Sequence, residues 1–346
     1  MNENRNEHNS ISGTDAQSVK KERIIAFDFI RAVCALGIII NHYSIESRNP
    51  LLIRFFYSFP SGTGSLGYSI VTVFFILSGA LLLYNHSDDQ TILTFYKTRW
   101  RAIFPSFYVS YVICFFIVIV FLDRSFCLTR SVYTFPLTII GMDGYFANAI
   151  RTWFVAGEWF IGAIIILYLL FPFIIRVYRH SSVFVYLASS ILFFLFLNLN
   201  MLEQNAFRNC FSCLFSFCFG MAVSQFQLYR FKPAFLLSCF VFIFCYFCPL
   251  SINGNLLCHL SGISLFFILY VLGDLIMRHP IVSLWVRRTA AISYEIFLVQ
   301  HIIIRLFLKA WFPSNTISNL FWLIATTIAT ILLANLVYRL KNRILR

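Results

Sequence analysis

The chain has 346 residues, of which 60% are hydrophobic and 12% are charged, and it carries 42 phenylalanines and a net charge of +13. A soluble domain of this length does not expose so much apolar surface, so the composition excludes a soluble globular protein and indicates an integral membrane protein. The basic residues lie between apolar segments, where membrane topology explains them, and we therefore expect no nucleic-acid partner.

Ten apolar runs approach the length of roughly 20 residues that a helix needs to cross a bilayer. They lie at approximately 26–47, 66–84, 103–122, 157–175, 182–198, 211–227, 234–250, 256–277, 290–311 and 317–337. We predict an all-α fold, a polytopic bundle of about ten transmembrane helices formed by residues 24–340. An even number of crossings puts both termini on one side, and most Lys and Arg residues fall on that side. The positive-inside rule therefore places both termini in the cytoplasm.

Two tails flank this predicted transmembrane domain. Residues 1–23 are polar and contain no apolar core of the signal-peptide type, so we expect a disordered cytoplasmic tail. Residues 341–346 are expected to form a short basic cytoplasmic tail. Most of the ten cysteines lie in the apolar runs, and the Cys210/Cys213 spacing has no second pair of ligands. We interpret the cysteines as buried small hydrophobic residues and predict no metal site and no disulfide set.

The first run carries Arg31 and His42, separated by ten mostly aliphatic residues. Eleven steps of about 100° bring the two side chains to nearly the same helix face, about 16 Å apart along the axis. Ionisable groups are costly in lipid, so we expect both to face one protein-lined cavity, with Asp28 orienting Arg31. A neutral imidazole in a water-accessible crevice is a suitable general base for a hydroxyl group. The simpler alternative is that Arg31 snorkels to the interface and His42 makes a packing hydrogen bond.

The second run contains a Phe-Phe-Ile-Leu-Ser-Gly-Ala segment that ends with Ser78, Gly79 and Ala80. Small residues in a membrane helix favour close helix packing, which is our main interpretation of this segment. In a functional alternative, the same small residues open space for a narrow thioester arm beside the first helix.

Three cations, Lys97, Arg99 and Arg101, precede the third run, with a tryptophan among them. Anchoring by the positive-inside rule accounts for some of this charge. The set also suits a phosphate-bearing ligand such as cytoplasmic acyl-CoA, because Lys and Arg donors neutralise pyrophosphate while a ring stacks on a base. We expect these residues to bind the donor.

The long segment 123–156 is rich in aromatic residues, and we expect it to lie along or dip into the outer surface as a partly ordered platform. Glu158 follows it at the entry to the fourth run. A carboxylate at the mouth of such a platform is placed to orient sugar hydroxyls or the imidazole. It is alternatively an interfacial residue among the aromatic residues of the membrane belt.

The ninth run contains Tyr294, Glu295, His301 and Arg305. His301 and Arg305 are four residues apart and share a helix face, and Glu295 is expected to pair with a cation near the inner boundary. We expect this ionisable cluster to line the same cavity as the pair in the first run. A structural hydrogen-bond network explains it as readily.

Together these motifs resemble the acyltransferase 3 family of multi-pass membrane acyltransferases, which modify bacterial surface polysaccharides and similar acceptors. The resemblance spans nearly all of residues 24–311. It rests on the Arg-x10-His spacing, the Phe-Phe-x-Leu-Ser-Gly segment, the basic stretch ending in Ile-Phe-Pro, the Gly-Glu-Trp-Phe entry and the late Ser-Tyr followed by His. It implies a cytoplasmic acyl-CoA donor and an acceptor modified on the far side of the membrane.

Carried over by this resemblance, Arg31 and His42 become the essential pair, and Lys97, Arg99 and Arg101 become the donor-side cations. One departure concerns Ala102, because the family often has Arg at this place, three residues before the loop proline. The cation that meets phosphate is therefore open.

We predict a membrane O-acyltransferase, specifically an O-acetyltransferase, in the bacterial cytoplasmic (inner) membrane. Acetyl-CoA is expected as donor substrate, with no permanently bound cofactor, and the acceptor is a hydroxyl of a cell-surface polysaccharide or its lipid-linked precursor. Transfer is either direct or through an acyl group held briefly by His42, and Arg31 positions the donor, stabilises the oxyanion or both. The alternatives are a transporter or flippase, with Arg31, His42, Glu158 and His301 as a relay, and a polysaccharide polymerase.

Overall fold

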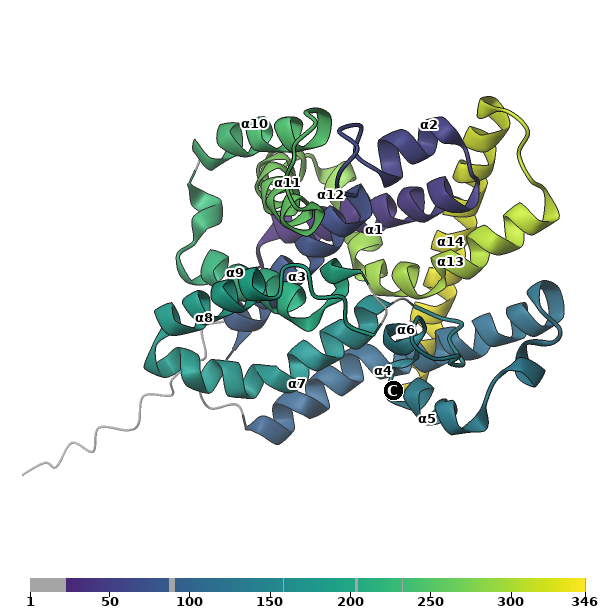
Figure 1. Cartoon of the computed structure of the whole chain (residues 1–346). Helices are drawn as coiled ribbons and strands as arrows, with labels where there is room; N and C mark the ends of the chain where they lie inside the picture. The colour runs from purple at the N-terminus through teal and green to yellow at the C-terminus, as the bar shows by residue number, and fades with distance from the viewer. Residues whose placement is uncertain (1–22, 87–90, 158, 203–204, 232, 346) are drawn as a thin grey trace, which may run out of the picture.

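The computed structural model describes residues 23–86, 91–157, 159–202, 205–231 and 233–345, and these residues form helices with no strand (Figure 1). The predicted all-α fold is confirmed. The longer helices are α1 (Ile25–Glu46), α3 (Leu66–Asn85), α4 (Ile92–Ile117), α7 (Trp159–His180), α11 (Gly254–Ile276), α13 (Ser293–Ala310) and α14 (Thr316–Ile344). The shorter ones are α2 (Pro50–Leu52), α5 (Phe135–Ile139), α6 (Asp143–Phe146), α8 (Ser182–Leu195), α9 (Cys210–Gln225), α10 (Pro233–Phe247) and α12 (Pro280–Ala291). π-helical turns η1 (Ile53–Tyr57) and η2 (Val118–Leu122) and short 3-10 turns complete the described chain.

Helices occupy all ten predicted segments, but they differ in length. Within the described chain, six are long and apolar enough to cross a membrane, or seven if the pair α12 and α13, bent by 68°, forms one span. The helices α8, α9 and α10 have 14, 16 and 15 residues. At a rise of 1.5 Å per residue they are about 21 to 24 Å long, against a hydrocarbon core of about 30 Å. The molecule is a multi-pass membrane protein, and the count of ten crossings and the side of the termini stay predictions.

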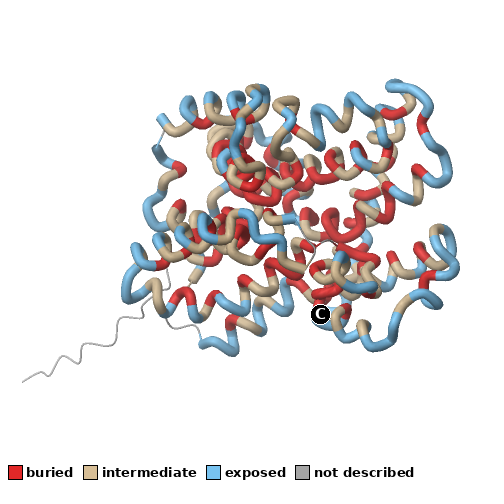
Figure 2. Tube along the Cα trace, viewed as in Figure 1, coloured by how far each residue is buried: buried red, intermediate tan, exposed pale blue. Residues whose placement is uncertain are grey.

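The bundle is organised around α1 and α3 (Figure 1). Helix α3 packs against α9 and α11, whereas α1 packs against α11 on one side and α13 on the other. Buried residues concentrate in these central helices, and the outer helices show exposed surface (Figure 2). That outer surface is largely apolar, as in Leu236, Leu237 and Phe240 of α10, which fits contact with lipid tails.

Helices α3 and α9 approach each other through two glycines. A Cβ atom added to Gly79 would overlap the backbone oxygen of Phe217, and one added to Gly220 would overlap that of Ile76. Because small residues let membrane helices pack backbone to backbone, the predicted packing role of Gly79 is confirmed.

Changing Gly79 to Ala should therefore destabilise the bundle by roughly 1–3 kcal/mol, because the added methyl group forces the two backbones apart. Thermal unfolding of the purified protein in detergent measures the loss. Gly254→Ala is the matched control, since the nearest heavy atom to its added Cβ is 3.9 Å away. Equal melting temperatures for the two variants would contradict the close contact.

The segments at the edges of the bundle were predicted less well. Most of the predicted N-terminal tail, 1–22, lies outside the described residues. At the C-terminus, α14 continues to Ile344, so most of the predicted basic tail is helical, and Lys341 in its last turns pairs with Glu295 of α13. The outer segment folds into short helical turns, including α5 and α6. There Asp143 is buried, accepts a hydrogen bond from the Gly144 amide at 2.9 Å, and has its pKa raised to about 7 by burial.

Candidate active site

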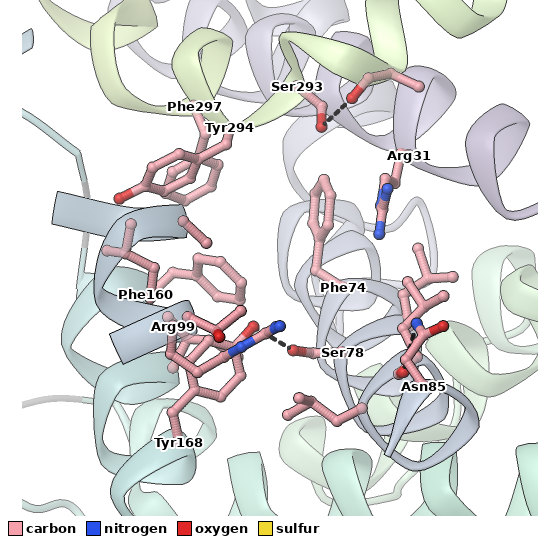
Figure 3. A pocket seen from close by; sticks show the side chains of 18 of the residues that line it. Arg31, Phe74, Ser78, Asn85, Arg99, Phe160, Tyr168, Ser293, Tyr294 and Phe297 are labelled. Atoms are coloured by element: carbon pink, nitrogen blue, oxygen red, sulfur yellow. Dashed lines mark hydrogen bonds between the residues drawn. The ribbon is translucent and has the colours of Figure 1, made fainter. Parts of the chain in front are cut away.

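A cavity of about 580 Å³ lies at the end of the bundle where α1, α4 and α13 begin and α3 and α14 end. We call it the Arg31 cavity. Arg31 lies in the second turn of α1, Asn85 is the last residue of α3, and Lys341 lies near the end of α14. The wall also includes Phe74, Ser78, Arg99, Phe160, Tyr168, Tyr294, Glu295 and Phe297 (Figure 3).

Arg31 and Arg99 enter this cavity from different helices (Figure 3). The Arg31 Nη1 atom lies 4.0 Å from Asp28 Oδ1, so the predicted pair is present, but Asp28 also binds Arg23 Nη2 at 2.8 Å. The Arg99 guanidinium lies 5.8 Å from the ring centres of Phe95 and Tyr168. Its buried Nε has no hydrogen-bond partner among the described residues, and a buried donor gains free energy from an anionic ligand.

The three predicted donor-binding cations separate in the structure. Arg99 lines the Arg31 cavity, whereas Lys97 and Arg101 are exposed and do not contribute to its wall. All three lie on the first turns of α4, so the helix turns only the middle one inward. Spacing in the sequence could not decide which cation faces a ligand.

Glu295 is buried at the cavity wall, with 1% of its surface exposed. Its Oε1 accepts hydrogen bonds from Lys341 Nζ at 2.8 Å and from Ser106 Oγ at 2.6 Å. The predicted cation partner of Glu295 is therefore confirmed, and it is Lys341, a residue that we had placed in the C-terminal tail. The neighbouring Tyr294 lines the cavity with a buried hydroxyl that has no hydrogen-bond partner among the described residues.

Removing the charge of Lys341 should therefore destabilise the protein strongly. Lys341→Met leaves the Glu295 carboxylate buried without its cation, which costs roughly 3–5 kcal/mol, and Glu295→Gln in the same chain should recover most of that loss. Thermal or denaturant unfolding in detergent measures the cycle. Arg343→Met, an exposed neighbour in the last turn of α14, is the control and should unfold like the wild type. A double variant no more stable than Lys341→Met would contradict the pairing.

Ser78 and Gly79 have different environments although they are adjacent. Ser78 lies on the cavity wall, where its Oγ is 2.9 Å from the Tyr168 hydroxyl, so the pair joins α3 to α7 (Figure 3). Gly79 faces α9 instead. The small residues of this segment thus both pack a helix and border the cavity.

A second cluster of ionisable residues surrounds His42, near the opposite end of α1. The rings of His42 and His301 are 5.3 Å apart and nearly perpendicular. His301 Nε2 lies 3.4 Å from Glu46 Oε1, and Arg305 Nε binds the same oxygen at 3.0 Å. His42 and His301 are both partly exposed. His301 and Arg305 share the predicted helix face, and both contact Glu46, which lies one helical turn beyond His42 and was not predicted from the sequence.

The predicted single cavity is not what the structure contains. The Arg31 cavity does not include His42 or His301 in its wall. On the shared face of α1, Ala35 and Ile38 lie between the two ends and are 0% and 2% exposed. The ionisable residues of the ninth run are divided between the two sites in the same way. Glu295 lines the Arg31 cavity, whereas His301 lies about 9 Å further along α13. Glu158 lies outside the described residues.

Comparison with known proteins assigns this arrangement to a family. A model of the acyltransferase 3 family, described as an acyltransferase domain, matches residues 24–339. The chain belongs to the acyltransferase 3 family. The matched range contains α1 from end to end and therefore both ends of the candidate site. Comparisons with curated proteins and with solved structures each find no match.

Proposed function

We propose that this membrane acyltransferase is an O-acetyltransferase of the bacterial cytoplasmic membrane. It moves an acetyl group from cytoplasmic acetyl-CoA to a hydroxyl of a cell-surface polysaccharide or its lipid-linked precursor. The observation that carries the proposal is the position of Arg31 and His42 near opposite ends of α1: Arg31 lines a basic cavity, and His42 lies beside His301 of α13. Family membership supports acyl transfer over the transporter and polymerase alternatives.

Acetyl-CoA docks at the Arg31 cavity. Of the described Lys and Arg residues in the cavity wall, Lys341 is hydrogen-bonded to a carboxylate, whereas Arg31 and Arg99 have no hydrogen-bonded carboxylate among the described residues. Guanidinium groups suit the phosphates of the donor because they offer several donors in one plane. The thioester then extends from Arg31 toward His42, a distance of about 16 Å along α1 that an extended pantetheine arm can cover.

His42 acts as general base in the transfer step. The acceptor hydroxyl oxygen bonds to the thioester carbonyl carbon, its proton passes to the imidazole, the C–S bond breaks, and the proton leaves with the CoA thiolate as a thiol. His42 becomes cationic during this step. Glu46 lies beside His301, whose ring centre is 5.3 Å from that of His42, so a carboxylate stands near the imidazole that takes the proton. Arg305 and Glu46 fix the geometry of His301 in turn.

The His42→Ala variant should lose acetylation of the glycan by at least about a hundredfold, because a positioned general base typically contributes that much. Transfer from acetyl-CoA to glycan in membrane vesicles measures the effect, with the amount of protein in the membrane quantified in parallel. His180→Ala is the control, since His180 is an exposed residue in the last turn of α7. Full activity of His42→Ala would remove the proposed mechanism.

Arg99→Gln should raise the KM for acetyl-CoA by about tenfold or more, because a charge-assisted hydrogen bond contributes roughly 1.5–3 kcal/mol. The KM for the acceptor should change little. Lys97→Gln and Arg101→Gln are matched controls on the same helix and should leave both values near those of the wild type. If the three variants behave alike, the cations serve only to orient the protein in the membrane, and the Arg31 cavity does not bind the donor.

A further inference from the structure

A second pocket, of about 370 Å³, lies where the loops between α1 and α3, α8 and α9, and α10 and α11 meet. Its polar wall is made mainly of amide and phenol side chains, and we call it the amide pocket. These side chains are Tyr57, Tyr68, Asn200, Asn205, Asn253 and Asn255. None of the described residues that line it is charged.

We propose that the amide pocket binds a neutral sugar unit of the acceptor glycan, next to the unit that is acetylated. The inference rests on the proposed function for the identity of the ligand, but its evidence is separate. It concerns the chemistry of the pocket and its position relative to His42.

The wall matches a ligand rich in hydroxyl groups. A side-chain amide both donates and accepts hydrogen bonds, as a sugar hydroxyl does. Asn255 is 7% exposed and donates to Leu197 O and Ser212 Oγ, both at 3.0 Å, while its Oδ1 has no hydrogen-bond partner among the described residues. A ligand hydroxyl would satisfy that buried acceptor. The described lining itself offers an ion no opposite charge, although the Arg208 guanidinium lies 5.8 Å from the ring centre of Tyr68.

The aromatic part of the wall is held rigidly. Tyr68 stacks on Phe207, with ring centres 4.4 Å apart and planes 21° apart, and Arg208 lies 5.8 Å from the Tyr68 ring centre. Phe207 also lines the pocket, so two stacked aromatic rings form part of its wall. Pockets of about 300–1,000 Å³ that combine apolar rings with a few polar groups are typical of small-molecule sites.

The amide pocket lies at the level of His42 in the bundle. The side chain of Asn41, the residue before His42, donates to Phe56 O at 2.8 Å and packs against Gly67, where a Cβ atom would overlap it. Tyr57 and Tyr68, which line the pocket, are the next residues after Phe56 and Gly67. Asn41 therefore contacts two residues that adjoin the pocket lining, and His42 is the next residue along α1. A sugar in the pocket and a sugar at His42 would belong to one glycan, so the proposal requires an acceptor with at least two linked units.

The test measures binding directly, with the full chain in lipid nanodiscs. The probes are neutral trisaccharides (cellotriose, maltotriose and N-acetylated chitotriose), with trigalacturonic acid as the charged comparison. We expect a neutral trisaccharide to bind, and Asn200→Leu and Tyr57→Ala each to weaken it by about tenfold, because each removes a direct contact. The matched controls are Asn148→Leu and Tyr133→Ala, exposed residues of the outer segment that should bind like the wild type.

Several outcomes would overturn the inference. The inference fails if no neutral trisaccharide binds, or if the pocket variants bind as well as the controls. It fails also if trigalacturonic acid binds more tightly than the neutral sugars. Displacement of the sugar by glycerophosphocholine would assign the pocket to a lipid headgroup. Two pocket variants are used so that a result remains if either Asn200→Leu or Tyr57→Ala misfolds. His42→Ala should still bind sugar. If the pocket variants weaken sugar binding but the protein transfers no acetyl group from acetyl-CoA, only the proposed function is contradicted. If the protein transfers the acetyl group but the pocket variants bind sugar as the wild type does, only this inference is contradicted.

Discussion

Ionised groups inside a membrane protein must be paired or face water, and this constraint organises the helices around α1. Three carboxylates meet it. Asp28 binds Arg23 and lies near Arg31 at the start of α1, and Glu46 binds His301 and Arg305 of α13 at its other end. Glu295, at the start of α13, binds Lys341 of α14. These pairs fix the register of α1, α13 and α14, and they set the positions of the two clusters used in the proposed reaction.

The same register leaves a barrier between the donor and the general base. Ala35 and Ile38 are buried on the face of α1 that connects Arg31 to His42, and Phe74, Phe160 and Phe297 pack together at the cavity wall with ring centres 5.1 to 6.4 Å apart. A thioester arm reaching His42 has to displace some of these contacts. When a large apolar side chain moves out of a packed site, it loses van der Waals contacts and buried area. The cost is on the order of 1.5–3 kcal/mol for each fully exposed side chain. In the proposed reaction, these contacts close the path along α1 while the donor is absent and open only when the thioester arm enters it.

The sequence was informative wherever the evidence was local. Apolar runs located the helices, and the 3.6-residue period correctly placed Arg31 near Asp28. The position of Glu295 near the predicted inner boundary led us to expect a cation beside it, which is Lys341. The sequence was not informative about pairs formed between distant segments. Lys341 is 46 residues from Glu295, and Arg305 is 259 residues from Glu46, so no helical spacing connects them. For the same reason, the shared helix face of Arg31 and His42 could not show whether the two side chains would line the same cavity.

The loops beside the amide pocket follow short helices. Helices α8, α9 and α10 are about 21 to 24 Å long, shorter than a hydrocarbon core of about 30 Å. Backbone groups in the loops that join them need partners inside the protein wherever lipid covers them. Asparagines supply them: Asn209 donates to Phe196 O and Leu199 O, both at 3.1 Å, and Asn255 donates to Leu197 O at 3.0 Å. Asn255 also lines the amide pocket, so a residue that holds a loop is at the same time part of the wall that we propose binds sugar hydroxyl groups.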